Sequence, residues 1–281
     1  MTSYVTDYAW ARPDPHATKA AGFVAVCRYL SHDHSGKTLT PAEVASLHSV
    51  GLGIVLNFED SAGRALAGRA AGYADAMFAN ALADSLGAPS TVAIYYSVDT
   101  DPGSPVREEV KQYVYGLLSA GGRAVGVYGG AVLVQWAFSV GVTFGWTANA
   151  SSWNHGVAPN GHLHQLYGHP AGTPLIAGVS PGDYDTSEIL NPNFGAWGGT
   201  TGGFSVTAEQ QIQVIYDNLM GGKGHSLLQD IENMVAALPK PPTANQIATA
   251  VVAKLPAGQV DVATLAKAIV KAEGEALLAA V

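Results

Sequence analysis

Residues 91–122 read TVAIYYSVDTDPGSPVREEVKQYVYGLLSAGG, a strand pattern followed by a helix pattern. The part from 91 to 99 is a nearly continuous run of apolar and aromatic residues, as expected of a buried strand. From 105 to 122 the apolar residues recur at helical spacing, and Ser104 followed by Pro105 is typical of a helix start. A buried strand followed by a helix predicts an α/β fold with a parallel sheet.

This alternation continues over residues 1–197. Strands are predicted at 3–9, 22–30, 53–59, 91–99, 123–129, 144–148, 162–167 and 182–185. Helices are predicted at 40–51, 63–87, 105–122 and 131–140. Eight strands favour a closed, TIM-like (β/α)8 barrel over a doubly wound sheet. Because residues 141–185 leave little room for helices, we expect an irregular barrel with thin helical cover on its later strands.

Composition and charge narrow the classes of protein. The chain has 281 residues, of which 48% are hydrophobic and 13% are charged, so it can bury one large core and is not disordered throughout. Its net charge of -8, with scattered Lys and Arg, argues against a nucleic-acid partner. Cys27 lies in an apolar run and is predicted to be a buried packing residue. The sequence shows neither a cationic start followed by an apolar run nor a stretch of about 18 uninterrupted apolar residues. We therefore expect neither a Sec signal peptide nor a membrane-spanning segment.

Acidic and aromatic side chains come at or just after the predicted strands. The acids are Asp7, Glu59, Asp99, Asp101, Asp183 and Asp185, and the other polar and aromatic residues are Tyr128, Trp146, Gln165 and Tyr167. In a parallel barrel the carboxyl ends of all strands open onto one face, where active sites are built. We therefore expect these side chains to converge at one mouth.

Two of the acids, Asp99 and Asp101, are separated by one residue, so on a strand they would both point towards the opening. Crowded carboxyl groups in a partly desolvated cup raise the pKa of at least one of them, leaving a proton donor beside an ionised partner. Cleavage of a glycosidic bond needs this pair of states, and aromatic walls suit the apolar faces of sugar rings. The pattern predicts glycoside hydrolysis.

Structural roles are the alternative for the same acids. The sequence DPGSP is typical of a turn, in which Asp99 or Asp101 could cap the following helix. Arg28 on the next strand could pair with Asp7. Asp183 and Asp185 lie near a Pro-Gly turn and could be ordinary loop residues.

No cofactor or metal is expected. The glycine-rich segment 121–130 lacks the endings of a phosphate-binding loop and of a dinucleotide fingerprint. The histidines form two groups, His32 with His34 and His162 with His164 and His169, and neither has a known zinc-ligand spacing.

Six short motifs carry a family resemblance. They are DYAW (7–10), YYSVDTD (95–101), GVYGG (126–130), WTANAS (146–151), HQLYG (164–168) and GDYDTSE (182–188). Over roughly residues 3–197 the chain resembles the glycoside-hydrolase-like domain, formerly of unknown function, of actinobacterial envelope proteins and actinophages. That domain is itself similar to family 25 lysozymes, which are muramidases with an irregular eight-stranded barrel.

The resemblance implies roles for these residues. Asp7, Asp99, Asp101 and Asp185 match the four acidic positions of the lysozyme site. Asp101 is expected to be the acid and Asp99 the nucleophile or electrostatic stabiliser, with Asp7 and Asp185 orienting water or sugar. Trp146, Gln165 and Tyr167 match residues that line the sugar site. The expected substrate is a cell-wall glycan.

One position departs from the lysozyme pattern. Lysozymes have glutamate where this chain has Asp101, whose shorter side chain would hold its carboxyl group about 1.5 Å further from the glycosidic oxygen. Misplacement by about 1 Å can lower a rate by about 10²-fold. Two functions remain open: a hydrolase, in which Glu59 could supply the missing reach, and a glycan-binding module without turnover.

The sequence changes character after Trp197. We predict a Gly-rich linker at 198–204, a helical segment at 205–238, a Pro-rich spacer at 239–243 and further helices at 244–281. Such short helices are marginal alone, so they should pack on copies of themselves or on the barrel. This region resembles the C-terminal part of actinophage minor tail proteins, which implies tail-protein partners, possible self-association, and a place in the virion tail or host envelope.

Overall fold

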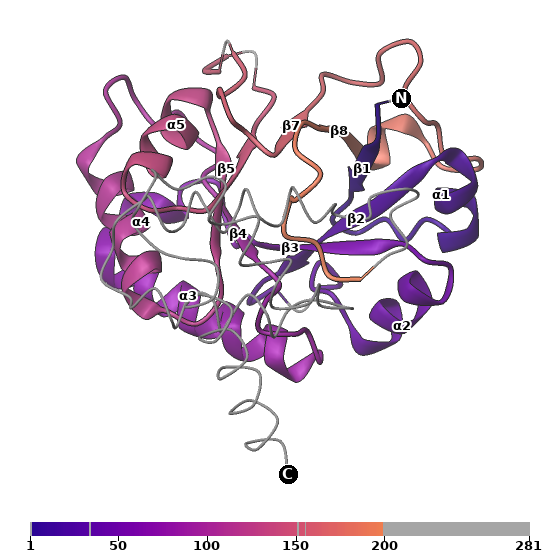
Figure 1. Ribbon diagram of the computed structural model, residues 1–281, viewed down its shortest axis with the longest axis horizontal. Coiled ribbons are helices and arrows are strands. Elements are labelled where there is room, and N and C mark those ends of the chain that lie inside the picture. The colour runs from indigo at the N-terminus through magenta and orange to yellow at the C-terminus, as the bar shows by residue number, and fades with distance from the viewer. Residues whose placement is uncertain (1, 34, 151, 155, 199–281) are drawn as a thin grey trace, which may run out of the picture. The chain divides into compact units, whose positions relative to one another are not determined.

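The computed structural model describes residues 2–33, 35–150, 152–154 and 156–198. Within them, eight strands close into a barrel in sequence order (Figure 1). They are β1 (Tyr4–Asp7), β2 (Phe23–Leu30), β3 (Gly53–Phe58), β4 (Ile94–Ser97), β5 (Val125–Gly129), β6 (Phe144–Thr147), β7 (Leu163–Gln165) and β8 (Asp185–Ile189). The predicted eight-stranded α/β barrel is confirmed.

The last strand differs from the prediction in position and direction. Pro181–Asp183 form a short 3-10 turn, η2, and the strand begins only at Asp185. β1 to β7 run parallel to one another, whereas β8 is antiparallel to both β1 and β7. The amino end of β8 therefore lies beside the carboxyl ends of the other strands. This direction places Asp185 at the mouth, directly opposite Asp7.

Helices cover the outside of the barrel (Figure 1). They are α1 (Pro15–Ala21), α2 (Pro41–Ser49), α3 (Gly68–Ser85, preceded by the 3-10 turn η1, Arg64–Ala67), α4 (Glu108–Ala120) and α5 (Ala131–Ser139). The predicted start of α2 is confirmed, because the Thr40 hydroxyl accepts a hydrogen bond from the Glu43 amide at 3.2 Å. Between β6 and β8 the described residues form no α-helix, as expected for thin cover.

Two helices differ from the sequence prediction. The first, α1, was not predicted, although Asp14 caps it by accepting a hydrogen bond from the Ala17 amide at 2.9 Å. α4 begins at Glu108 rather than at Pro105, because the preceding residues form a turn in which the Arg107 amide donates to the Pro102 carbonyl at 2.8 Å. None of the helices in the described ranges is long and apolar enough to cross a membrane.

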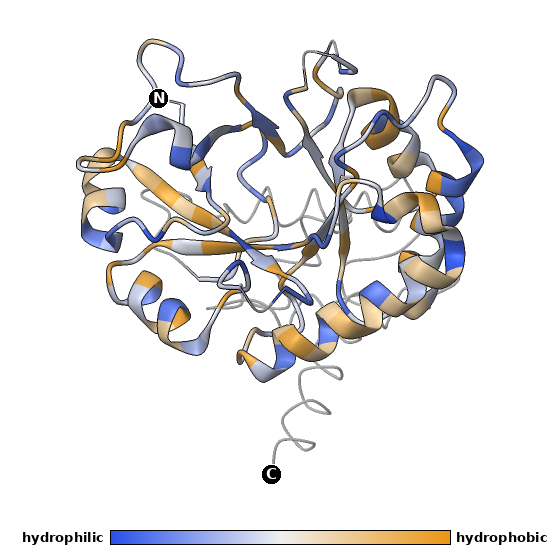
Figure 2. Ribbon diagram, turned by 180° about the vertical axis from the view of Figure 1, so that it is seen from behind, coloured by the Kyte–Doolittle hydropathy of each residue, from blue (hydrophilic) through white to orange (hydrophobic). Residues whose placement is uncertain are grey.

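Apolar side chains form two layers, one on each face of the strands. One layer contains helix residues together with strand residues such as Ile54 and Leu56, so it lies between barrel and helices. The other contains Val5, Val55 and Tyr95 but no helix residue, so it fills the barrel interior. Buried Cys27 belongs to the interior layer, which confirms its predicted packing role. Figure 2 shows the hydrophobic stretches along the strands and helices.

The barrel unit extends at least to Trp197, whose backbone exchanges two hydrogen bonds with Ile54 of β3, at 2.9 and 2.7 Å. Residues 199–281 lie outside the described part of the chain. The predicted domain limits, the helical segment 205–238, the spacer 239–243 and the helices 244–281 therefore stay predictions.

Helices α3 and α4 approach each other closely through two glycines. A Cβ atom at Gly116 would lie 2.2 Å from the Arg69 carbonyl oxygen, and one at Gly72 would lie 2.0 Å from the Tyr113 carbonyl oxygen. The same interface buries Asp75, whose carboxylate accepts hydrogen bonds from Arg64 (2.8 Å, Nε) and the Tyr113 hydroxyl (2.9 Å). Small residues at the crossing are thus a requirement of the packing.

We predict that Gly116→Ala lowers the free energy of unfolding by about 1–3 kcal/mol, because the new methyl group forces the two helices apart. Gly63→Ala is the matched control, since nothing lies within 4 Å of a Cβ at that exposed position. Urea unfolding of both variants measures the difference. If Gly116→Ala and the control were equally stable, helices α3 and α4 would have room for the added methyl group, which would contradict the prediction.

Candidate active site

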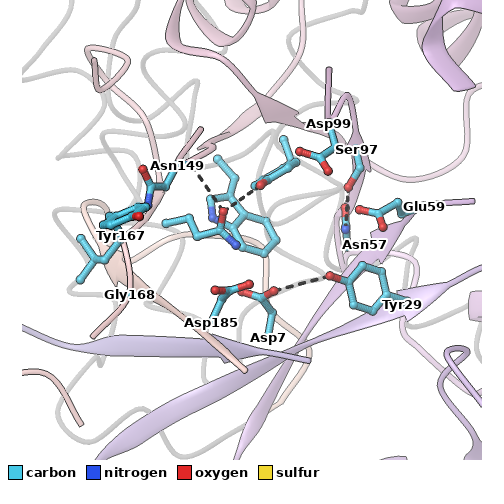
Figure 3. A pocket seen from close by; sticks show the side chains of 14 residues that line it. Asp7, Tyr29, Asn57, Glu59, Ser97, Asp99, Asn149, Tyr167, Gly168 and Asp185 are labelled. Atoms are coloured by element: carbon cyan, nitrogen blue, oxygen red, sulfur yellow. Dashed lines mark hydrogen bonds between the residues drawn. The ribbon is translucent and has the colours of Figure 1, made fainter. Parts of the chain in front are cut away.

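A cavity of about 370 Å³ opens at the carboxyl ends of the parallel strands (Figure 3). It is lined by Asp7, Tyr29, Asn57, Glu59, Ser97, Asp99, Tyr128, Trp146, Asn149, Gln165, Leu166, Tyr167, Gly168 and Asp185. Eight of the ten residues predicted from the sequence are among them. Its volume lies within the range of small-molecule sites, about 300–1,000 Å³.

The alternation of side chains along the strands explains which residues line the cavity. Val5, Val55 and Tyr95 point into the barrel interior and fill it. The residues two positions further on, which share the same face, are Asp7, Asn57 and Ser97. The interior is therefore apolar in its depth and polar at its mouth.

Two predicted site residues, Asp101 and Asp183, lie outside the cavity. β4 ends at Ser97, so the strand alternation does not continue to Asp101. The Asp101 carboxylate instead accepts a hydrogen bond from the Gly103 amide at 2.8 Å and lies 3.7 Å from Arg107. Asp183 is exposed in η2. Asp101 thus lies in a turn, as the structural alternative for the DPGSP segment describes. The expectation that its side chain points towards the opening of the barrel was wrong.

Asp7 and Asp185 face each other across the antiparallel β1–β8 pair. Asp7 is only 4% exposed, and its Oδ1 accepts a long hydrogen bond of 3.5 Å from the Tyr29 hydroxyl. Burial, followed by the charges of Asp185 and Glu59, holds the pKa of Asp7 well above its usual range. Partial burial also raises the pKa of the more exposed Asp185. The geometry favours a proton retained on this pair.

Asp99 and Glu59 lie on another part of the wall (Figure 3). Partial desolvation raises the pKa of Asp99, with the charge of Glu59 adding to the effect and that of Lys37 opposing it. Glu59 accepts a hydrogen bond from the Lys37 ammonium group at 2.6 Å. Lys37 is buried, and its ammonium lies 4.6 Å from the centre of the Tyr29 ring. Glu59 is therefore engaged in an ion pair.

Arg28 does not pair with Asp7, contrary to the structural alternative. Its fully buried guanidinium instead contacts the Glu43 carboxylate at 2.6 Å, the Lys37 carbonyl at 3.0 Å and the Tyr8 carbonyl. Arg28 thereby holds the backbone beside Asp7 and the loop that carries Lys37. No local pattern in the sequence pointed to Lys37.

Aromatic side chains form the remaining wall. Trp146 packs edge-on against Tyr128 with ring centres 4.9 Å apart, and its indole donates to Ser187 Oγ at 3.0 Å. The Tyr128 hydroxyl donates to Gln165 Oε1 at 2.8 Å. Tyr167 lies at the rim and is 78% exposed. Of these three aromatic side chains only Tyr167 presents its ring to solvent, because Trp146 and Tyr128 are 1% and 8% exposed.

Sequence reasoning missed four polar or aromatic residues that line the cavity: Tyr29, Asn57, Ser97 and Asn149. Extending the two-residue alternation beyond the last apolar interior residue would have found Tyr29, Asn57 and Ser97. Among the described residues, no group of three or more His, Cys, Asp or Glu is arranged to hold a metal ion.

A family model described as "Rv2525c-like, glycoside hydrolase-like domain" matches residues 16–187. This chain belongs to that family. The family resemblance inferred from the six motifs is confirmed, whereas nothing tests its actinophage part.

One relative of this chain is the protein Rv2525c of Mycobacterium tuberculosis, whose name describes it provisionally as a peptidoglycan hydrolase. It is 29% identical over 203 residues, 68% of this chain and 82% of that protein. A crystal structure of Rv2525c, described as Tat-secreted and in complex with L-tartrate, matches with a TM-score of 0.60 over 69% of this chain and 98% of that chain, at 29% identity. A family 25 glycosyl hydrolase of Streptococcus pneumoniae gives a TM-score of 0.46 at 14% identity, over 68% and 87% of the chains.

We predict that Asp7→Asn stabilises the protein at pH 7 by ~1–2 kcal/mol, because the amide removes a carboxyl group that resists ionisation. The folded-state pKa of Asp7 lies above the unfolded value of about 3.9, so the folded wild type binds more protons between these values. Wild-type stability should therefore fall as pH rises from about 4 through the folded pKa.

Thermal unfolding across this pH range measures the effect. The gap between Asp7→Asn and wild type should open as pH rises, while the exposed control Asp101→Asn shows no such opening. A constant gap would mean that Asp7 ionises normally in the folded protein.

Proposed function

We propose that this chain cleaves glycosidic bonds in peptidoglycan or a related cell-wall polysaccharide. The observation that carries the proposal is the meeting of Asp7, Asp99 and Asp185 in one cavity (Figure 3). Trp146 and Tyr128 line the same cavity. Paired carboxyl groups are typical of the active sites of glycoside hydrolases. Membership of a glycoside hydrolase-like family and the provisional name of Rv2525c support the same chemistry.

The carboxyl groups divide into a proton donor and an ionised partner. Asp7 and Asp185 interact strongly enough that a retained proton belongs to the pair rather than to either residue. This pair is the proposed general acid, which protonates the leaving oxygen. Asp99, which is exposed and lies on another part of the wall, is the proposed base or nucleophile on the other side of the sugar. The ion pair with Lys37 leaves Glu59 as a binding and electrostatic residue.

Glycan binding without turnover is the second candidate function. Asp101 takes the position at which lysozymes carry their acidic glutamate, yet it lies outside the cavity and faces Arg107. A cavity that lacks a donor at this position could keep its aromatic walls for recognition alone. The two candidates share the binding site and differ only in whether a bond breaks.

The cell envelope is the proposed place of action, because the proposed substrate lies there. Rv2525c is described as Tat-secreted, which agrees with this placement. The proposed virion-tail location, tail-protein partners and self-association all rest on residues 205–281, outside the described part of the chain. They stay predictions.

We predict that the full chain releases new reducing ends from purified actinobacterial peptidoglycan, and that Asp99→Asn slows this release by about 10²-fold or more. Asp101→Asn is the matched control, since the same change is made two residues away and outside the cavity. It should keep the rate within about twofold. Reducing-end assays and analysis of released muropeptides measure both variants.

The outcomes separate the alternatives. Loss of activity in Asp101→Asn but not in Asp99→Asn would restore the roles inferred from the sequence. Sedimentation of the wild type with wall glycan, without release of reducing ends and abolished by Trp146→Ala, would favour the binding module. A wild type that neither binds nor cleaves wall glycan would exclude both functions.

A further inference from the structure

Two buried polar atoms at the cavity have no hydrogen-bond partner of normal geometry among the described residues. They are Asp7 Oδ2 and Asn57 Oδ1, on side chains only 4% and 2% exposed. Both residues line the cavity (Figure 3). Buried polar groups in folded proteins are nearly always paired, so an unpaired group in a binding site marks a place where a ligand supplies the partner. Both vacant atoms are oxygens that can accept a hydrogen bond.

Four hydrogen-bond donors of the cavity wall are directed at protein acceptors. The pairs are Tyr29 to Asp7 (3.5 Å), Asn57 Nδ2 to Ser97 (2.8 Å), Tyr128 to Gln165 (2.8 Å) and Trp146 to Ser187 (3.0 Å). The two unpaired atoms of the buried wall are both acceptors. A ligand that complements these two atoms must bring N–H or O–H donors.

The charge of the cavity points the same way. Four of the lining residues are acids, whereas none of the described residues that line it is Lys, Arg or His. Lys37, behind the wall, is paired with Glu59. Within the described part of the chain no Lys or Arg forms an ion pair with Asp7, Asp99 or Asp185, and burial raises the pKa of all three carboxyl groups. The charge of His169 opposes this effect at Asp185, and that of Lys37 opposes it at Asp99. A bound cation would relieve this repulsion.

We propose that the cavity selects an amino sugar that carries a free ammonium group, that is, a de-N-acetylated glucosamine unit. The ammonium supplies three N–H donors and a positive charge to Asn57 Oδ1, Asp7 Oδ2 and the neighbouring carboxyl groups. An N-acetylated unit instead brings a carbonyl acceptor and no charge. This inference names the substrate class of the same site and rests on the proposed function.

The test compares two ligands of equal length on the wild-type full chain. Calorimetric titration with a hexamer of glucosamine and with a hexamer of N-acetylglucosamine is carried out at a pH where the free amine is charged. The glucosamine hexamer should bind about tenfold more tightly, as expected for one added charge-assisted hydrogen-bonding group. The preference should shrink as salt concentration rises.

Variants locate the preference. Asn57→Ala should lose several-fold in affinity for the glucosamine hexamer only, whereas Asn80→Ala should bind as wild type. Asn80 is the matched control, because its Oδ1 is also buried and unpaired but lies on α3, outside the cavity. Asp185→Asn should remove the preference. Glu109→Gln removes the same charge from an exposed position of α4 and should retain the preference.

Each outcome of the binding experiments supports or overturns the inference. Equal or tighter binding of the N-acetylated hexamer would overturn this inference and leave the glycan proposal standing. Binding of neither hexamer would overturn both. A preference that survives Asp185→Asn and Asn57→Ala but disappears in Glu109→Gln would assign it to surface charge and overturn the inference. Circular dichroism of each variant confirms that it is folded.

Discussion

The antiparallel pairing of β8 with β1 is the constraint on which the site depends. It closes the barrel and sets Asp185 directly opposite Asp7. The Thr6 hydroxyl, which donates to the Asp185 carbonyl at 2.9 Å, supports this register. Because side chains alternate along a strand, a slip by one residue would turn Asp185 away from the mouth. Two acids are thus forced together by the backbone, and no arginine or lysine in the described ranges forms an ion pair with either of them.

From this constraint the electrostatics of the cavity follow. Burial raises the pKa of both Asp7 and Asp185, and the charge of Asp185 raises that of Asp7 further, while the exposed Asp99 lies on another part of the wall. Arg28 does not neutralise the pair but fixes the backbone around it through Tyr8 and Lys37. The chain thereby keeps one positive charge next to Glu59 and leaves the other carboxyl groups for a ligand.

Much of this could be predicted from the sequence, because strand patterns, helix starts and acids at strand ends are local signals. Asp7, Glu59 and Asp99 were placed at the mouth by that reasoning. The direction of β8 was not predictable, since it depends on how the chain turns before Asp185. Asp101 was misplaced because the end of β4 could not be located to the residue. Lys37 could not be predicted, because its position depends on contacts across the fold. Arg28 binds its carbonyl oxygen, and its ammonium group lies over the Tyr29 ring.

A crystal structure of the full chain carrying Asp99→Asn, soaked with a glycan hexamer, tests most directly whether Asp7 and Asp185 lie within reach of a glycosidic bond. We expect a sugar ring in the cavity and a glycosidic oxygen within about 3.2 Å of a carboxyl oxygen of Asp7 or Asp185. A hexamer bound elsewhere on the barrel would contradict this expectation, and so would one bound in the cavity with every glycosidic oxygen out of reach of these carboxyl groups.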